Sequence, residues 1–251
     1  MPISVQAEVA SKTSSLSSGA AVPVEELEAV GRLPNCTATL IGQRLVLTAA
    51  HCVCPSDNNA QGCRTRYEFT LTDVYPTDNP STPQDESQIR ADVTIAGNVV
   101  VHPNYTAGGW LRKDLALIVL DRPVWEVAKG IQPIPVADDA HRAKIGETVV
   151  LVGYGNTGEG CTAGSLGKQW LALSISDIVP DAIRFNHPGL VSCPGDSGGP
   201  ILNDDGWLVG VASWTNSDDQ STYRPAWESL SWIHSVRETT EVNPVEGTVV
   251  V

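Results

Sequence analysis

Short apolar runs, separated by turns rich in glycine, proline, asparagine and aspartate, dominate the chain from about Glu28 onward. Residues 37–41 and 44–48 flank Gly42-Gln43, which predicts a tight hairpin. One stretch, about residues 226–238, has apolar side chains at helical spacing. Further strands are predicted at residues 93–102, 115–120, 148–153, 170–175, 182–185, 200–202 and 207–214.

The predicted strands fall into two clusters, which indicates an all-β protein built as two barrels with one terminal helix. Residues 121–135 carry three prolines and little periodicity, so we expect the crossing between the barrels there. Residues 55–62 and 76–88 read as surface loops. We expect a lead-in over residues 1–25, a first barrel over 26–122, a second barrel over 123–237 with a helix at about 226–238, and a tail over 239–251.

The acidic composition limits the partners. The formal net charge is -13, and nucleic acid and anionic membranes both need cationic contacts, so neither is expected. No apolar run approaches the roughly 18 residues that span a bilayer. The first 22 residues lack the apolar region of a signal peptide.

The six cysteines are an even number with close local spacings, which favours disulfides and an extracytoplasmic or secreted location. Six cysteines allow 15 pairings, so the sequence alone fixes none. A zinc site is the alternative, since His51, Cys52, Cys54 and Cys63 cluster. Calcium could bind the acidic residues of segment 73–92, but their spacing suits a solvated loop better. We therefore expect no metal and no cofactor.

A glycine-rich segment, Gly195-Asp-Ser-Gly-Gly-Pro200, offers a nucleophile on a tight turn. The turn can aim the backbone N–H groups of Gly195 and Ser197 at one point, where an oxyanion would develop. A plain glycine-serine turn is the alternative for this segment alone.

Two further segments supply partners for that serine. His51 lies in Thr48-Ala-Ala-His-Cys52, and an ordinary histidine accepts a proton near neutral pH. Asp114 opens an apolar strand, an expensive place for a carboxylate without partners, and imidazole is the natural partner. The remaining histidines lack such contexts and are interpreted as structural: His102, His141, His187 and His234.

Together these three segments, in this order, resemble the trypsin/chymotrypsin family of serine proteases. The resemblance runs from about Glu28 to Arg237 and implies two packed six-stranded antiparallel Greek-key barrels with a C-terminal helix. It also implies a serine endopeptidase that works through an acyl-enzyme. Further matches are Cys36, Val101-His-Pro-Asn-Tyr105, Gly153-Tyr-Gly-Asn-Thr157, Val211-Ala-Ser-Trp214 and Ser231-Trp-Ile233.

The resemblance assigns roles residue by residue. It makes Ser197 the nucleophile, His51 the general base, and Asp114 the acid that orients the imidazole. Gly195 and Ser197 N–H would form the oxyanion hole. Ser213 would hydrogen-bond to Asp114, and Ser213-Trp214-Thr215 would pair with the substrate backbone as an added strand.

The resemblance also implies disulfides. It pairs Cys36 with Cys52; Cys54 and Cys63 share one loop and are expected to pair locally. Cys193 lacks its usual partner after the Ser-Trp segment, so by elimination it pairs with Cys161, which departs from the family.

Two other departures concern the region around the nucleophile. Thr37 and Ala38 replace two glycines, and the usual Ile-Val-Gly-Gly mature N-terminus is missing. The new amino group of such an N-terminus would pair with Asp196. Either the chain is a precursor cleaved before about Val30, or another group takes the place of that amine beside Asp196.

Substrate preference in this family depends on the residue six before the nucleophile, here Val191 rather than an acid. Ser192 adds a neutral hydroxyl. Thr215 and, by a less secure alignment, Ala226 replace the two glycines of the pocket walls. The pocket is therefore predicted to be shallow and apolar, with cleavage after small or medium aliphatic residues. Glu228 is close enough in sequence to offer an alternative counter-charge for Lys or Arg.

Two other classes of protein share features with this sequence. The Gly195–Gly199 segment also fits the nucleophile elbow of α/β-hydrolases, but there the serine comes first in the chain and helices are abundant. A catalytically silent binding module with a protease fold is the second alternative. Polypeptide substrates, and a protein inhibitor, are the partners considered, and a monomer is expected.

Overall fold

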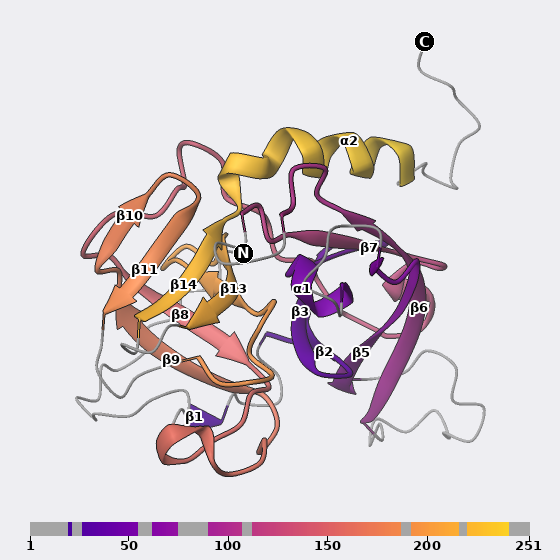
Figure 1. Cartoon of the computed structure of the whole chain (residues 1–251). Coiled ribbons are helices and arrows are strands. Elements are labelled where there is room, and N and C mark those ends of the chain that lie inside the picture. Colours follow the sequence, from indigo (N-terminus) through magenta and orange to yellow (C-terminus); the bar gives the residue numbers. More distant parts are fainter. Residues whose placement is uncertain are drawn as a thin grey trace.

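The computed structural model describes residues 20–21, 27–54, 62–74, 90–106, 112–186, 192–215 and 220–240. The expected lead-in, apart from residues 20–21, and the tail beyond residue 240 lie outside these ranges. So do residues 55–61, most of the acidic segment 73–92, and Val191. The described residues form two antiparallel β-structures that lie side by side, with a helix across one end (Figure 1).

The first structure is a closed barrel of six antiparallel strands in the order β2-β3-β4-β7-β6-β5. Its interior is filled by fully buried side chains such as Leu40, Leu47, Phe69 and Leu117. A one-turn helix, α1 (Ala50–Val53), follows β4 at the edge of the barrel. The strands are β2 (Val30–Leu33), β3 (Cys36–Gly42), β4 (Leu45–Thr48), β5 (Arg66–Val74), β6 (Ala91–Val101) and β7 (Ala116–Leu120).

The second structure is a barrel-like sheet in which eight described strands follow the order β1-β9-β8-β12-β13-β14-β11-β10. Two short edge strands, β1 (Ala20–Ala21) and β10 (Asp177–Val179), flank the central six. Its core centres on Leu151, Phe185 and Tyr223. The central strands are β8 (Thr148–Gly153), β9 (Gln169–Ser174), β11 (Ala182–Asn186), β12 (Pro200–Leu202), β13 (Leu208–Thr215) and β14 (Gln220–Pro225).

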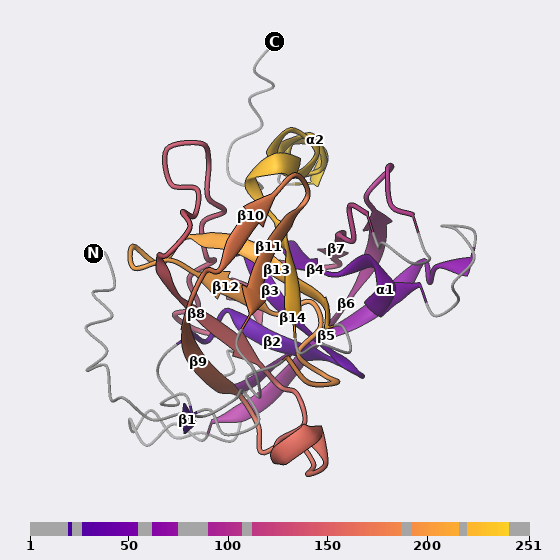
Figure 2. The ribbon, with the colours of Figure 1, turned by 60° about the vertical axis from the view of Figure 1, so that its left-hand side comes forward.

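The C-terminal helix joins the two structures. A 3₁₀ turn (Trp227–Ser229) leads from β14 into α2 (Leu230–Thr240), which extends over the first barrel (Figures 1 and 2). Ile233 is buried in the core of that barrel, and Arg237 donates a hydrogen bond to the carbonyl of Ile41 over 2.7 Å. No described helix is long and apolar enough to cross a membrane.

This architecture confirms the predicted all-β class with a terminal helix. The helix begins as a 3₁₀ turn and ends two residues beyond the predicted bound. Two further 3₁₀ turns, Val124–Glu126 and Glu159–Cys161, lie in the long connections on either side of β8.

Candidate active site

His51 and Asp114 meet at the edge of the first barrel, although 63 positions separate them in the chain. α1 carries His51, and Asp114 lies just before β7. Nδ1 of His51 lies 2.7 Å from Oδ2 of Asp114, and the backbone N–H of His51 donates to Oδ1 over 2.9 Å. A carboxylate only accepts hydrogen bonds, so Nδ1 carries the ring proton and Nε2 keeps its lone pair. The imidazole is thereby held as the tautomer that can accept a proton at Nε2.

Ser213 completes the surroundings of the Asp114 carboxylate, which is fully buried. Its Oγ donates to Oδ2 of Asp114 over 2.6 Å. Ser213 occupies a β-bulge in β13, because Ala212 pairs with Tyr223 while Trp214 pairs with Thr222. A bulge turns one side chain away from the regular alternation, and here it directs Ser213 at the acid.

The turn that carries Ser197 is held between the two β-structures. Gly195 and Gly198 have φ values of +104° and +83°, which L side chains rarely adopt. A Cβ at Gly198 would also collide with Thr48 and with the backbone of Thr37. The carbonyl of Ser197 accepts from the N–H of Thr37 over 2.8 Å. The glycines therefore allow the serine to sit close against the first barrel.

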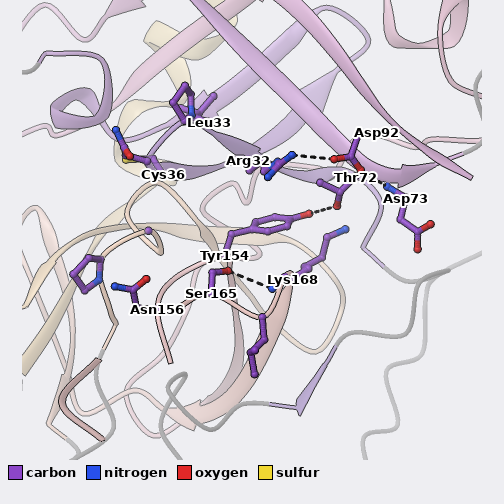
Figure 3. A pocket seen from close by; sticks show the side chains of 16 residues that line it. Arg32, Leu33, Cys36, Thr72, Asp73, Asp92, Tyr154, Asn156, Ser165 and Lys168 are labelled. Atoms are coloured by element: carbon purple, nitrogen blue, oxygen red, sulfur yellow. Dashed lines mark hydrogen bonds and ion pairs between the residues drawn. The ribbon is translucent and has the colours of Figure 1, made fainter. Parts of the chain in front are cut away.

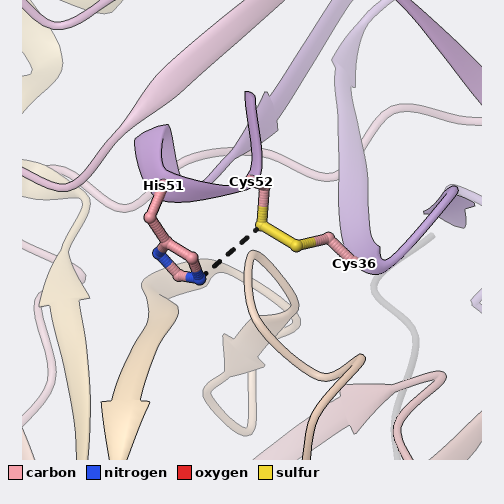
Figure 4. A group of neighbouring side chains, drawn as sticks. All are labelled: Cys36, His51 and Cys52. Carbon is pink, nitrogen blue, oxygen red and sulfur yellow. Dashed lines mark hydrogen bonds between the residues drawn. A yellow bond between two sulfur atoms is a disulfide. The ribbon is translucent and has the colours of Figure 1, made fainter. Parts of the chain in front are cut away.

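The Cys36–Cys52 disulfide lies beside His51 (Figure 4). Sγ of Cys52 is 3.9 Å from Nε2 of His51 and 3.6 Å from the carbonyl oxygen of Ser197. No hydrogen bond joins Nε2 of His51 to Oγ of Ser197 among the described residues. Such bonds are often long before substrate binds.

Disulfide bonding removes the ligands of the alternative zinc site. Cys54 pairs with Cys63, so these sulfurs and those of Cys36 and Cys52 offer no thiolates to a metal. The third disulfide joins Cys161 to Cys193 and tethers the loop after β8 to the segment before the nucleophile. All three pairs agree with the predicted pairing.

Asp196 precedes the nucleophile and is almost fully buried. Its carboxylate accepts from the backbone N–H of Gly155 over 2.7 Å and of Cys193 over 2.8 Å. Burial raises the pKa of Asp196 to about 6, although these two hydrogen bonds act in the opposite direction. Two backbone donors are thus the described partners of this carboxylate.

Thr37 links three parts of the site through one buried side chain. Its Oγ1 donates to the carbonyl of Gly195 over 2.8 Å and accepts from the N–H of Tyr154 over 3.0 Å. Its carbonyl accepts from Oγ1 of Thr48 over 2.9 Å. The threonine that replaces a family glycine therefore connects β3 with β8 and with the serine turn.

A cluster of four hydroxyl side chains lies behind the serine turn: Ser192, Thr215, Ser221 and Tyr223. Oγ of Ser192 is 2.7 Å from the Tyr223 hydroxyl, and the N–H of Ser192 donates to Oγ of Ser221 over 3.1 Å. Oγ1 of Thr215 lies 3.2 Å from Oγ of Ser221. Burial raises the pKa of Tyr223, so it remains a neutral hydroxyl. The cluster is neutral throughout.

Ala226 is not part of this cluster. It is fully buried in the core that Ile233 shares, and its N–H donates to the carbonyl of Val209. Ser221, which the sequence analysis did not name, occupies the place beside Thr215. Glu228 is not part of the cluster either. Its carboxylate accepts a hydrogen bond from Nζ of Lys113 over 2.8 Å. Trp214 is partly buried in β13, next to Ser213.

A cavity of about 800 Å³ opens on the other side of the serine turn, between the two β-structures (Figure 3). Gly195 and Cys36 border it on the side of the site. Tyr154 crosses its floor and bonds to Thr72, while an Arg32–Asp92 ion pair lies at one wall. Burial lowers the pKa of Lys168, another lining residue, to about 8.

The fold and this arrangement define a class: a two-barrel protein with a serine turn, a histidine and a buried aspartate at the junction. A family model described as "Trypsin" matches residues 27–233. The chain therefore belongs to the trypsin family of serine proteases.

Several curated proteins are similar to the chain. Phenoloxidase-activating factor 3 of Holotrichia diomphalia is 32% identical over 202 residues, 72% of this chain and 56% of that protein. Trypsin of Saccharopolyspora erythraea is 32% identical over 198 residues, 71% of this chain and 74% of that protein. Trypsin of Squalus acanthias is 27% identical over 218 residues, 79% of this chain and 84% of that protein. The chain thus spans little more than half of the first relative.

Proposed function

We propose that this protein is a serine endopeptidase that uses His51, Asp114 and Ser197 as a catalytic triad. The observation that carries the proposal is the hydrogen-bonded His51–Asp114–Ser213 group, which holds the ring proton of the imidazole at Nδ1. Nε2 lies 3.9 Å from Sγ of Cys52, which in turn is 3.6 Å from the carbonyl oxygen of Ser197. An imidazole fixed in this tautomer is what a serine nucleophile needs as its base.

In the proposed reaction, Nε2 of His51 takes the proton of Ser197 as Oγ attacks the substrate carbonyl. The N–H groups of Gly195 and Ser197 stabilise the oxyanion. His51 then gives the proton to the leaving amine, which produces an acyl-enzyme and a free C-terminal fragment. Water, deprotonated by His51, attacks the acyl-enzyme, His51 returns the proton to Oγ of Ser197, and the N-terminal fragment leaves with a new carboxyl group. Asp114 stabilises the imidazolium and is not itself protonated.

The substrate backbone would add as a strand along Ser213-Trp214-Thr215. The part of the substrate on the C-terminal side of the cleaved bond would enter the cavity that Gly195 and Cys36 border. Three disulfides and the family support action on polypeptides in a secreted or extracytoplasmic setting.

We infer cleavage after small or medium apolar residues such as Ala, Val or Leu. Thr215 and Ser221 would form the walls of the substrate pocket, where both are larger than the glycines of the family, and their hydroxyls are already hydrogen-bonded to each other. Val191 and Ser192 provide no negative charge. A lysine or arginine side chain would lose its hydration there without a counter-charge. In this proposal Ser221, in place of Ala226, forms the second wall of the pocket. Glu228 forms an ion pair with Lys113, so it does not serve as the counter-charge for a substrate Lys or Arg.

A peptide library with cleavage sites read by mass spectrometry tests activity and preference together. We expect cuts after Ala, Val and Leu, and almost none after Lys or Arg. Replacing Thr215 and Ser221 by glycine should extend cleavage to Phe and Tyr, while the same replacement at Ala226 should not. Preferred cleavage after Arg or Lys would overturn the pocket assignment. No cleavage by a folded protein would favour the silent binding module.

A further inference from the structure

A buried arginine contacts the group that supports the proposed triad. Arg224 lies in β14 and is only 5% exposed. Its Nε donates to Oγ of Ser213 over 3.3 Å. Its Nη1 donates to the backbone carbonyl of Asp181 over 2.6 Å and lies 3.4 Å from the carboxylate of the same residue. Neighbouring Tyr223 points to Ser192 instead, as strand alternation requires.

The contact with Arg224 fixes the direction of the Ser213 hydroxyl. A guanidinium has only donors, so Oγ of Ser213 must accept from it. The single hydroxyl proton of Ser213 is then directed at Oδ2 of Asp114, which lies 2.6 Å away. Arg224 thus acts on Asp114 through one intervening hydroxyl.

Beyond Arg224 the charges alternate in sign. Asp181 lies between Arg224 and Lys113, whose Nζ is 3.3 Å from Asp181 and 2.8 Å from Glu228. Burial opposes the charge of Lys113, but Glu228 and Asp181 together raise its pKa. The series therefore runs from Asp114 through Arg224, Asp181 and Lys113 to Glu228.

The backbone supports this series. Lys113 and Asp181 both have positive φ, 47° and 65°, which is uncommon for residues other than glycine. The N–H of Lys113 donates to the Asp181 carboxylate over 3.1 Å, which helps to hold the residue before Asp114 in that conformation.

The charge balance of the series depends on His51. With a neutral imidazole, the three acids and two bases carry one excess negative charge, and an imidazolium cancels it. Burial lowers the pKa of Arg224, which Asp181 and Asp114 partly offset, and an arginine remains a cation in any case. Two other groups face the series. Arg184 in β11 adds a more distant positive charge, and burial lowers the pKa of His102, so it stays neutral at pH 7.

We propose that Arg224 is a positioning residue for the His51–Asp114 pair, which orients the Ser213 hydroxyl and limits the negative charge that Asp114 presents to the imidazole. This inference rests on the proposed peptidase function. Without Arg224, Ser213 can rotate its proton away from Asp114, and the imidazolium gains stability. Activity would then be lower and would need a higher pH to appear.

The test measures kcat, KM and the pH profile of kcat/KM for Arg224→Gln on a peptide that the wild type cleaves. We expect kcat to fall about tenfold, with KM changed less than about twofold, because Arg224 touches no substrate. We expect the midpoint of the pH profile to move up by about 0.5 to 1 unit, since a cation near the pair is lost.

Arg184→Gln is the matched control. It removes the same charge from the neighbouring strand, and Arg184 pairs with Asp177 rather than with Ser213. Its kcat and pH midpoint should stay close to those of the wild type. Arg224→Lys covers the case in which Arg224→Gln does not fold. It keeps the charge, so the pH midpoint should return to the wild-type value. Its kcat should stay several-fold low, because one ammonium replaces the guanidinium fork that reaches both Ser213 and Asp181.

A folded Arg224→Gln variant with the same kcat and pH midpoint as Arg184→Gln would overturn the inference about Arg224 and would leave the proposed peptidase function standing. If only Arg224→Lys folds, wild-type kcat in that variant would overturn it. A wild type that neither cleaves peptides nor reacts with a fluorophosphonate would overturn the proposed function, and this inference with it.

Discussion

Replacing Thr37 by valine should weaken the attachment of the serine turn to the first barrel with the smallest change of shape. Valine keeps the volume but removes the hydroxyl that donates to Gly195 and accepts from Tyr154. Thr37 is fully buried, so water cannot easily replace either bond. Each partner left unsatisfied costs about 1–3 kcal/mol, so for the two partners the loss should total about 2–6 kcal/mol.

Part of this lost free energy should lower the free energy of unfolding, and the rest should raise the barrier of the catalysed reaction. The Gly195 carbonyl belongs to the turn whose N–H groups would bind the oxyanion, and losing one such donor outright costs about 3–4 kcal/mol. A loosened turn should cost less, so kcat for Thr37→Val should fall about 10- to 100-fold, while Thr37→Ser should stay within about threefold. The assay compares kcat and KM for peptide cleavage with urea unfolding in a Ser197→Ala background, where self-cleavage is absent.

Thr39→Val provides the control. Thr39 lies two positions along the same strand, is also buried, and its Oγ1 has no hydrogen-bond partner among the described residues. Its replacement should leave kcat unchanged and should not destabilise the protein. If Thr37→Val matched Thr39→Val in kcat, the proposed coupling between Thr37 and the oxyanion turn would be refuted.

Two further predictions concern the same turn. Because burial raises the pKa of Asp196 to about 6, above its ordinary value, folded protein holds a proton that the unfolded chain loses near pH 4. The free energy of unfolding should therefore fall by about 3 kcal/mol, relative to Asp196→Asn, as pH rises from about 4 to 6, and then level off. Unfolding at four pH values checks this, and a pH-independent difference would contradict it. Replacing Cys161 and Cys193 by serine opens a loop of 32 positions and should cost roughly 3–4 kcal/mol. Calorimetry measures that loss, and an unchanged melting temperature would argue against the tether.

The sequence predicts those parts of the fold in which side-chain pattern and burial agree. Strand β7 is continuously apolar and was found, whereas β14, Gln-Ser-Thr-Tyr-Arg-Pro, is polar and was missed. Its hydroxyls and its arginine are buried because they bond to Ser192, Thr215 and Ser213, partners that no local pattern shows. Without β14 the sequence analysis places Ala226 in the pocket wall, whereas the pairing of Ser221 with Thr215 supports our proposal of Ser221 for that position.

A different kind of miss concerns β5. Tyr67, Phe69 and Leu71 alternate with more exposed residues there, so period-two alternation could have revealed this strand. The candidate residues themselves could be named from local motifs. The β-bulge that aims Ser213, and the bond from Arg224 to Ser213, depend on strand register and lie beyond a reading of the sequence.

The most direct test of the central claim is the intact mass of the folded protein after reaction with a fluorophosphonate, followed by peptide mapping. The account predicts one adduct, located on Ser197, that is lost in Ser197→Ala and strongly slowed in His51→Ala. A folded wild-type protein that stays unlabelled, or one labelled at another residue, would contradict it.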